Sequence, residues 1–194
     1  MFAYIEGTLT TRNPAYVVVD CQGVGYMIHI SLNTFTQIKD LTSARLLTHL
    51  LVREDAQLLY GFYTEEERRV FRLLIAVSGI GANTARMILS SLSPADLVQA
   101  IVTGNEPVLK KIKGIGAKTA QRLIVELKDK VAKTQGLSDL GSASYNTNRE
   151  EALSALVILG FARPAVEKVL DGLMREHGMT IPVEQIIRLA LKVL

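Results

Sequence analysis

Apolar and polar residues alternate with a period of two through much of the first 62 residues, a pattern typical of short β-strands. Stretches rich in Val, Ile, Tyr, Thr and Leu, separated by turn residues, predict strands over residues 2–11, 15–21, 24–31, 44–53 and 56–62. Strands this short and this closely spaced favour a closed, OB-like β-barrel over residues 1–62, because closure leaves few open sheet edges. Residues 31–43 predict a short helix or an irregular connection.

After Phe62 the apolar period changes to 3.6, which indicates helices. Thr64 and Glu67 have the spacing of a capping box, and Ser93 followed by Pro94 is a second helix start. Residues 63–134 therefore predict a compact bundle of about five short helices.

Residues 133–149 are rich in Gly, Ser, Thr and Asn, so we expect a flexible linker over 135–149. Beyond it, apolar spacing predicts helices over residues 150–162, 164–177 and 183–194. A three-helix domain over 150–194 is so small that it leaves apolar surface uncovered unless a partner covers it. The predicted fold class is thus α+β and multidomain.

Composition removes several classes of protein. No apolar run reaches the roughly 18 residues of a membrane-spanning helix, and the N-terminus lacks the pattern of a secretory signal. Cys21 is the only cysteine, which excludes an internal disulfide and favours a reducing cytoplasm. Because His29, His49 and His177 lack metal-binding spacing, we expect no metal and no cofactor.

The charge is unevenly distributed along the chain. Residues 1–62 and 135–194 each have a net charge of −1, whereas residues 63–134 have +5, which together give the overall +3. A basic middle third is the footprint of a phosphate-facing module, but a solvated basic surface explains it equally well.

An internal repeat decides between these readings. Gly79–Ala85 and Gly114–Ala120, thirty-five residues apart, are identical at six of seven positions. Two glycines around one apolar residue allow a tight turn between helices, with Ile80 or Ile115 tucked inward. The turn and the first residues of the next helix then present unpaired amides, which form an anion site suited to a backbone phosphate.

Such a site recognises backbone position and shape, not base sequence. Lys118 and Arg122 lie four residues apart on one helix face and are expected to clamp the same strand. A single copy would be read as a mere helix–helix turn, but two copies in the basic third favour DNA. Since no phosphate-binding motif of the ATPase type is present, we expect no catalysis by this chain. The residues expected to contact DNA are Gly79, Ile80, Gly81, Asn83, Thr84, Gly114, Ile115, Gly116, Lys118, Thr119 and Arg122.

Paired Gly-Ile-Gly turns after a β-domain resemble the RuvA family of bacterial Holliday-junction recognition proteins. Residues 52–62 (VREDAQLLYGF) and 114–129 (GIGAKTAQRLIVELKD) resemble that family closely, and the resemblance covers the whole chain. It implies two helix-hairpin-helix motifs and a homotetramer formed through the barrels, with one or two tetramers on each four-way junction. It also implies partners in DNA recombination and repair: the hexameric ATPase RuvB, recruited by the C-terminal domain for branch migration, and the nuclease RuvC.

The resemblance assigns an acidic pin to Glu54 and Asp55. Two carboxylates at a strand–strand tip would repel phosphates and keep the strands apart at the crossover. Without the resemblance, an ordinary polar hairpin tip is the better reading.

Two positions depart from the family pattern, which often has lysine at Asn83 and Ala117. The first turn thus lacks a charge at its helix entrance, and Arg86 is expected to compensate.

The resemblance also places a motor-binding patch in the C-terminal domain at Leu156, Leu159, Gly160 and Phe161. Leu156 and Leu159 fit the small core equally well, and Phe161 is expected to be the most exposed.

Two other function classes stay open. A DNA glycosylase also uses a Gly-x-Gly hairpin, but the chain lacks tryptophan and offers only Lys128-Asp129-Lys130 where a catalytic acid would be needed. A general duplex-binding subunit of a nuclease or helicase, without junction preference, is opposed only by the resemblance and by the Glu54-Asp55 tip.

Overall fold

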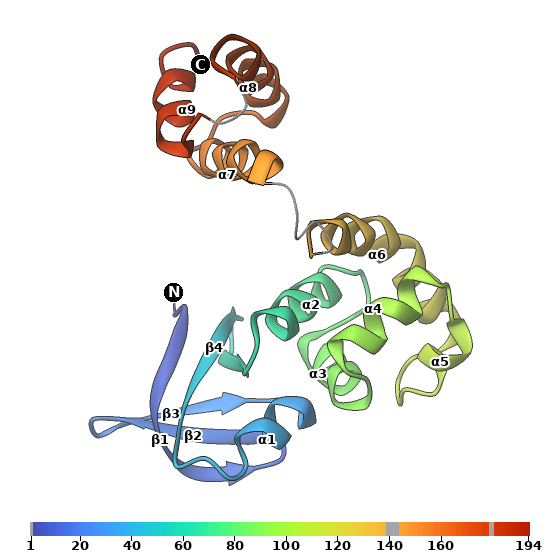
Figure 1. Cartoon of the computed structure of the whole chain (residues 1–194). Helices are drawn as coiled ribbons and strands as arrows, with labels where there is room; N and C mark the ends of the chain where they lie inside the picture. The colour runs from blue at the N-terminus through green and yellow to red at the C-terminus, as the bar shows by residue number, and fades with distance from the viewer. Residues whose placement is uncertain (1, 139–143, 179–180) are drawn as a thin grey trace. The chain divides into compact units, whose positions relative to one another are not determined.

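The computed structural model describes residues 2–138, 144–178 and 181–194. The chain forms two compact units, Met1–Gln135 and Gly136–Leu194. The N-terminal unit contains the strands and the helices α1 to α5 together with most of α6, and the C-terminal unit is helical (Figure 1).

A closed barrel opens the N-terminal unit. Its strands are β1 (Tyr4–Asn13), β2 (Tyr16–Cys21), β3 (Val24–His29), β4 (Ser43–Val52) and β5 (Gln57–Phe62). Their order around the barrel is β1-β2-β3-β5-β4, and only the β3–β5 pairing is parallel. This architecture confirms the predicted OB-like barrel, and each strand lies within two residues of its predicted bounds.

The first strand closes the barrel because it pairs with two neighbours. Thr8 faces Asp20 of β2 and also Ser43 of β4. At Gly7 the strands approach so closely that an added Cβ would lie 2.1 Å from the Asp20 carbonyl oxygen, which explains the glycine.

Helices follow the barrel and complete the N-terminal unit. They are α1 (Leu32–Ile38, between β3 and β4), α2 (Glu65–Ile75), α3 (Ala82–Ser91), α4 (Pro94–Val102), α5 (Glu106–Lys110) and α6 (Ala117–Ser138). The predicted helix starts are confirmed: the Thr64 hydroxyl accepts from the Glu67 amide at 3.2 Å, and the Ser93 hydroxyl accepts from the Asp96 amide at 3.1 Å.

The last barrel strand and the helices share an apolar cluster, and the barrel interior holds a second cluster of its own. The Phe71 ring of α2 packs against Tyr60 and Phe62 of β5, with ring centroids 5.2 and 4.8 Å apart. All three side chains are buried and belong to the cluster that also contains the apolar faces of α3, α4 and α6. Burying aromatic rings of this size is a large stabilising contribution, so the helices are held firmly against the barrel.

The short helix α1 adds polar contacts between barrel and bundle. Its cap Ser31 and its buried Thr34 both donate hydroxyl hydrogen bonds to the Glu67 carboxylate of α2. The Asn33 amide donates to the carbonyls of Leu89 and Leu92 at the end of α3, at 2.5 and 3.0 Å. These contacts anchor both helices that flank the first Gly-Ile-Gly turn.

The C-terminal unit packs α7 (Ser144–Ile158), α8 (Arg163–His177) and α9 (Val183–Ala190) around its own core. Leu156, Val166, Leu170 and Ile186 are fully buried there. Helix α6 continues to Ser138 and α7 begins at Ser144, so both helices reach further into the expected linker than composition indicates. The remaining linker residues, 139–143, lie outside the described residues.

Within the described ranges of the chain, no helix is long and apolar enough to cross a membrane.

Candidate nucleic-acid interface

The two Gly-Ile-Gly turns have the same local structure. In the first, which joins α2 to α3, the amides of Val77, Ile80 and Ala85 donate to the carbonyls three or four residues earlier, at 3.1, 3.0 and 2.9 Å. In the second, which joins α5 to α6, the amides of Ile112, Ile115 and Ala120 make the equivalent bonds at 3.2, 3.0 and 2.9 Å. The sequence repeat is therefore a structural repeat with an offset of 35 residues.

The first glycine of each turn has a conformational reason. Gly79 and Gly114 have φ angles of 87° and 89°, in the left-handed region that other residues avoid. The apolar residue that follows is buried, with Ile80 and Ile115 each 4% exposed. The glycine conformation and the buried isoleucine together fix the geometry of each turn.

The second glycine of each turn has no such reason. Gly81 and Gly116 do not have positive φ angles, and a Cβ added to either would meet no atom within 4 Å. Nothing among the residues that the structure describes therefore requires glycine at these positions. A bare backbone here keeps the surface open to whatever approaches it from outside.

The helices that follow the turns begin without side-chain caps. Other helices of this unit have a capping side chain: Ser31 for α1, Thr64 for α2, Ser93 for α4 and Asn105 for α5. Gly81 caps α3 without a side-chain hydrogen bond, and Gly116, which precedes α6, has no side chain to offer.

Unpaired amides result at both helix starts. Within the described part of the chain, the amides of residues 82–84 and 117–119 have no hydrogen-bond partner. Each turn therefore presents donors at the positive end of a helix, which is an anion-binding geometry.

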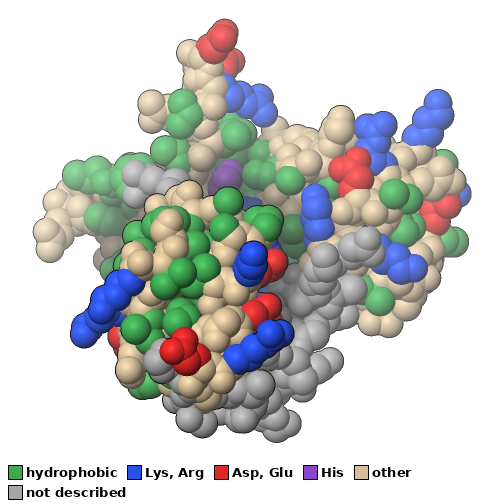
Figure 2. Space-filling view, turned by 90° about the horizontal axis from the view of Figure 1, so that it is seen from above, with side chains coloured by type: hydrophobic (Ala, Val, Ile, Leu, Met, Phe, Trp, Pro, Cys, Tyr) green, Lys and Arg blue, Asp and Glu red, His purple; other side chains and the backbone are tan. Residues whose placement is uncertain are grey.

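The predicted contact residues lie at these helix starts. Asn83 and Lys118 are exposed at equivalent positions, and Thr84 and Thr119 are half-buried. Lys118 has no ion-pair partner among the described residues, and neither does the exposed Lys113 just before the second turn. Figure 2 shows Lys and Arg side chains standing out over the helical part of the N-terminal unit, at the right of the view.

Two arginines make contacts within the protein that the sequence did not predict. Arg86, expected to compensate for the missing charge at Asn83, donates from Nη1 to the Ala15 carbonyl of the barrel at 2.8 Å. Arg122 lies beside the first turn and donates from Nη1 to the Ser78 carbonyl at 3.1 Å. Sequence reasoning missed both contacts because the partners are 71 and 44 residues away along the chain.

The acidic pair lies at a strand–strand tip. Glu54 and Asp55 are exposed in the turn between β4 and β5, which closes through a 2.8 Å hydrogen bond from the Arg53 amide to the Ala56 carbonyl. Both carboxylates are therefore available to act on an approaching phosphate.

The expected motor-binding residues of the C-terminal unit differ in exposure. Leu156 is fully buried, which agrees with the alternative prediction that it belongs to the core. Leu159, in contrast, is 61% exposed. The expectation for Phe161 is wrong: its side chain is half-buried against the core. Gly160, with φ at 101°, ends α7 and lets the Phe161 amide return to the Leu156 carbonyl, which turns the ring inward.

Sequence reasoning also missed two exposed residues of this unit. Ile158 and Val157 are 84% and 40% exposed. The signal was the unbroken apolar run from Leu156 to Leu159, because one helix face cannot bury four consecutive residues. In Figure 2 hydrophobic side chains gather on the near face of this unit.

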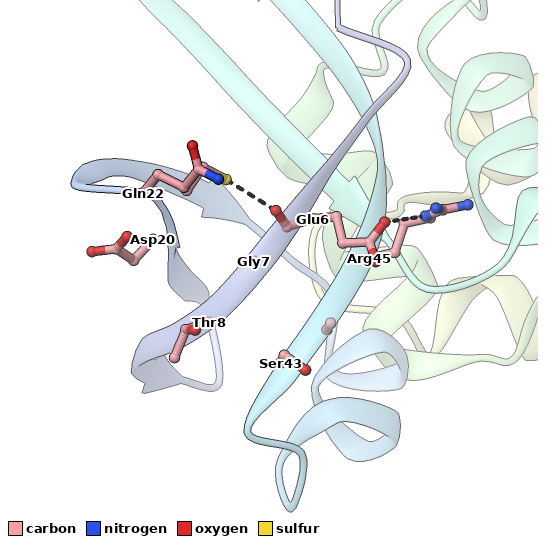
Figure 3. Close-up of a pocket in the computed structure, with 9 residues that line it drawn as sticks. Glu6, Gly7, Thr8, Asp20, Gln22, Ser43 and Arg45 are labelled. Atoms are coloured by element: carbon pink, nitrogen blue, oxygen red, sulfur yellow. Dashed lines mark hydrogen bonds and ion pairs between the residues drawn. The ribbon is translucent and has the colours of Figure 1, made fainter.

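A pocket of about 750 Å³ lies beside the crossing of β1 with β2 and β4 (Figure 3). Its lining is polar, and two of the lining residues, Glu6 and Arg45, form an ion pair with each other at 2.6 Å. None of the residues expected to contact DNA or a motor lines it. Within the described residues, no group of three or more His, Cys, Asp or Glu side chains is placed to hold a metal ion.

The barrel and the paired turns define a DNA-binding protein of the tandem helix-hairpin-helix class. Residues 1–61 match the family described as "RuvA N terminal domain", residues 71–129 the "SAM-like Helix-hairpin-helix tandem", and residues 147–194 the "RuvA, C-terminal domain". The chain belongs to the RuvA family.

Relatives that match over the full length support this family assignment. The chain is 49% identical over 192 residues to the "Holliday junction branch migration complex subunit RuvA" of Christiangramia forsetii, with 99% of each chain covered. It is 50% identical over 202 residues to the protein of the same name from Bacteroides thetaiotaomicron, again with 99% of each covered.

Proposed function

We propose that this protein binds four-way (Holliday) DNA junctions without regard to sequence and serves as the non-catalytic subunit of a branch-migration complex. The relatives' printed name supports the substrate and the complex. Because the named relatives are bacterial and bacterial DNA lies in the cytoplasm, we place this activity there.

One observation carries the DNA-binding part of the proposal. No contact or φ angle within the described residues requires glycine at Gly81 or Gly116, and each precedes a helix start with unpaired amides. A phosphate oxygen can approach the bare backbone and accept hydrogen bonds from these amides. A side chain at the glycine would obstruct that approach. The two Gly-Ile-Gly turns of one subunit hold a duplex arm by its phosphate backbone. Beside them lie Asn83, Thr84, Lys118 and Thr119.

The exposed tip suits an electrostatic role. Glu54 and Asp55 on each subunit would repel phosphates at the crossover and direct the strands away from one another.

A homotetramer would present one such tip and one pair of turns to each arm, and a pair of tetramers would present two of each. Exposed apolar side chains on the barrel support self-association. They include Phe2, Tyr4, Val24, Met27 and Val52, each more than 40% exposed.

The C-terminal unit is proposed to recruit the ATPase RuvB, with RuvC as a further partner of the complex. The exposed Val157, Ile158 and Leu159 form an apolar surface at the end of α7 that suits a protein partner. The buried Leu156 contributes to this surface only by supporting the helix.

The alternative, a general duplex-binding subunit, makes the same backbone contacts and differs only in junction preference. The decisive measurement is the affinity of the full-length protein for a four-way junction and for a linear duplex of matching arm sequence, at equal salt. We expect tighter binding to the junction; equal affinity would favour the alternative.

Lys118→Ala tests the phosphate contact in the same assay. Each lost phosphate contact lowers the salt dependence of log K by about one unit. Asn83→Ala, at the equivalent position of the other turn, removes no charge and is the matched control, so its salt dependence should equal that of the wild type. An unchanged slope for Lys118→Ala would exclude the contact.

A further inference from the structure

Each helix-hairpin-helix repeat reaches across to the turn of the other. On α6, Nη1 of Arg122 lies 3.8 Å from the position of an added Cβ on Gly79. On α3, Cε of Met87 lies 3.7 Å from the same position on Gly114. Arg122 and Met87 are equivalent in the repeat, and so are the two glycines, because each pair is separated by 35 residues.

The two contacts differ in chemistry although they match in place. Arg122 donates a hydrogen bond of 3.1 Å to the Ser78 carbonyl, the last residue before the first turn. Met87 offers a thioether methyl, which has no hydrogen to donate and is limited to van der Waals contact. A charged donor to a carbonyl is directional, whereas a methionine tolerates displacement.

The position of Arg122 bears on the expectation that it clamps phosphate. Its Nη1 is engaged by the first turn, and its Nε lies 3.9 Å from the Glu126 carboxylate one helical turn away. The hydrogen bond to the turn, with the weaker and partly exposed ion pair to Glu126, favours a side-chain conformation that keeps the guanidinium at the first turn.

We propose that Arg122 is a positioning residue that holds the two Gly-Ile-Gly turns at a fixed separation. This inference rests on the proposed DNA-binding function. Two phosphate sites on one rigid body bind a duplex backbone together, and the second contact benefits from the first only while their separation is maintained. Arg122 raises DNA affinity by pre-organising the first turn, and a direct phosphate contact is the competing role.

The test begins without DNA, on the full-length chain. The substitution Arg122→Met gives this position the residue that its equivalent in the other repeat, Met87, already has. We expect the amides of Ile80 and Ala85, which are hydrogen-bonded within the first turn, to exchange with solvent about fivefold faster than in the wild type. The equivalent amides of Ile115 and Ala120 should be unchanged, and Lys118→Ala should alter neither pair. Unchanged exchange at Ile80 and Ala85 would overturn the inference.

The second arm measures junction affinity at several salt concentrations. Arg122→Met should bind about fivefold more weakly with the wild-type salt slope, because affinity is lost through positioning. A slope lower by about one unit, as expected for Lys118→Ala, would show a direct phosphate contact and overturn the inference.

An exchange of the two side chains completes the design. The double variant Met87→Arg with Arg122→Met has the composition and net charge of the wild type and places an arginine opposite the second turn. We expect it to bind the junction more tightly than Arg122→Met alone, and equal or weaker binding would count against the inference. Should the wild type bind neither junction nor duplex, the proposed function fails while the exchange measurement still reports on the contact.

Discussion

Glu67 is a buried carboxylate in a network that joins α1 to α2. The side chain is 1% exposed, and both of its oxygens accept from hydroxyls, one from Ser31 and the other from Thr34 at 2.6 Å. Burial raises the pKa of Glu67 above its ordinary value of 4.5, against the opposing effect of these hydrogen bonds. The carboxylate thus orients the helix before the first turn, at some cost when it is ionised.

The pH dependence of stability should reveal this cost. The folded protein binds the Glu67 proton more tightly than the unfolded chain, so the contribution of Glu67 to the free energy of unfolding is complete below pH 4.5 and is lost as pH rises through the raised pKa. Glu67→Gln carries no charge, and it can still accept from Ser31 and donate to the Thr34 hydroxyl. We expect the free energy of unfolding of this variant, relative to wild type, to increase with pH above 4.5.

Denaturant unfolding of both proteins between pH 4 and 8 checks this. Burial lowers the pKa of His29 and of His49, but both residues are present in both proteins and cancel in the difference. Glu67→Ala is the contrasting variant, because it leaves two buried hydroxyls without an acceptor and should cost about 1–3 kcal/mol. A difference between Glu67→Gln and wild type that does not vary with pH would contradict the assignment.

At the scale of elements, the helix-hairpin-helix turns use two glycines for two purposes. Gly114 adopts a left-handed conformation that the turn requires, whereas Gly116 is conformationally ordinary and borders open space. Local folding therefore accounts for the first glycine of each turn and the proposed phosphate contact for the second.

Alanine substitutions should separate these purposes. Gly114→Ala should lower stability by about 1–2 kcal/mol, because a side chain is strained at a φ of 89°. Gly116→Ala should alter stability by no more than about 0.5 kcal/mol but weaken junction binding, because its methyl group would stand before the unpaired amides. Thermal unfolding and junction affinity, measured on both variants, check the contrast. Wild-type binding by Gly116→Ala would argue against phosphate contact at this turn.

At the scale of the whole molecule, the two compact units have separate cores and carry different candidate sites. The C-terminal core contains no residue of the core shared by barrel and helical bundle, so each unit buries its own apolar surface. The turns and the acidic tip belong to the first unit, and the exposed apolar end of α7 belongs to the second.

Removal of residues 150–194 should therefore spare junction binding and abolish stimulation of the RuvB ATPase. Junction affinity and ATP hydrolysis by RuvB in the presence of the truncated protein provide the two measurements, with the full-length chain as reference. Loss of DNA binding on truncation would refute this division of roles.

Local signals predicted much of the fold and the position of the turns. Strand alternation, the caps at Thr64 and Ser93, and the repeated Gly-Ile-Gly act within a few residues of the chain. These features are set by backbone geometry and side-chain reach, which neighbouring residues determine directly.

Tertiary structure alone decided which side chains face which partners. Arg86 donates a hydrogen bond to a carbonyl of the barrel, and Arg122 donates to the carbonyl before the opposite turn. Leu159 is exposed, whereas Phe161 is half-buried. The sequence established that these residues lie on helices or at their ends, but not the neighbour each would meet. That neighbour depends on how elements distant in the chain pack together, and packing is decided by the burial of the whole core rather than by any local pattern.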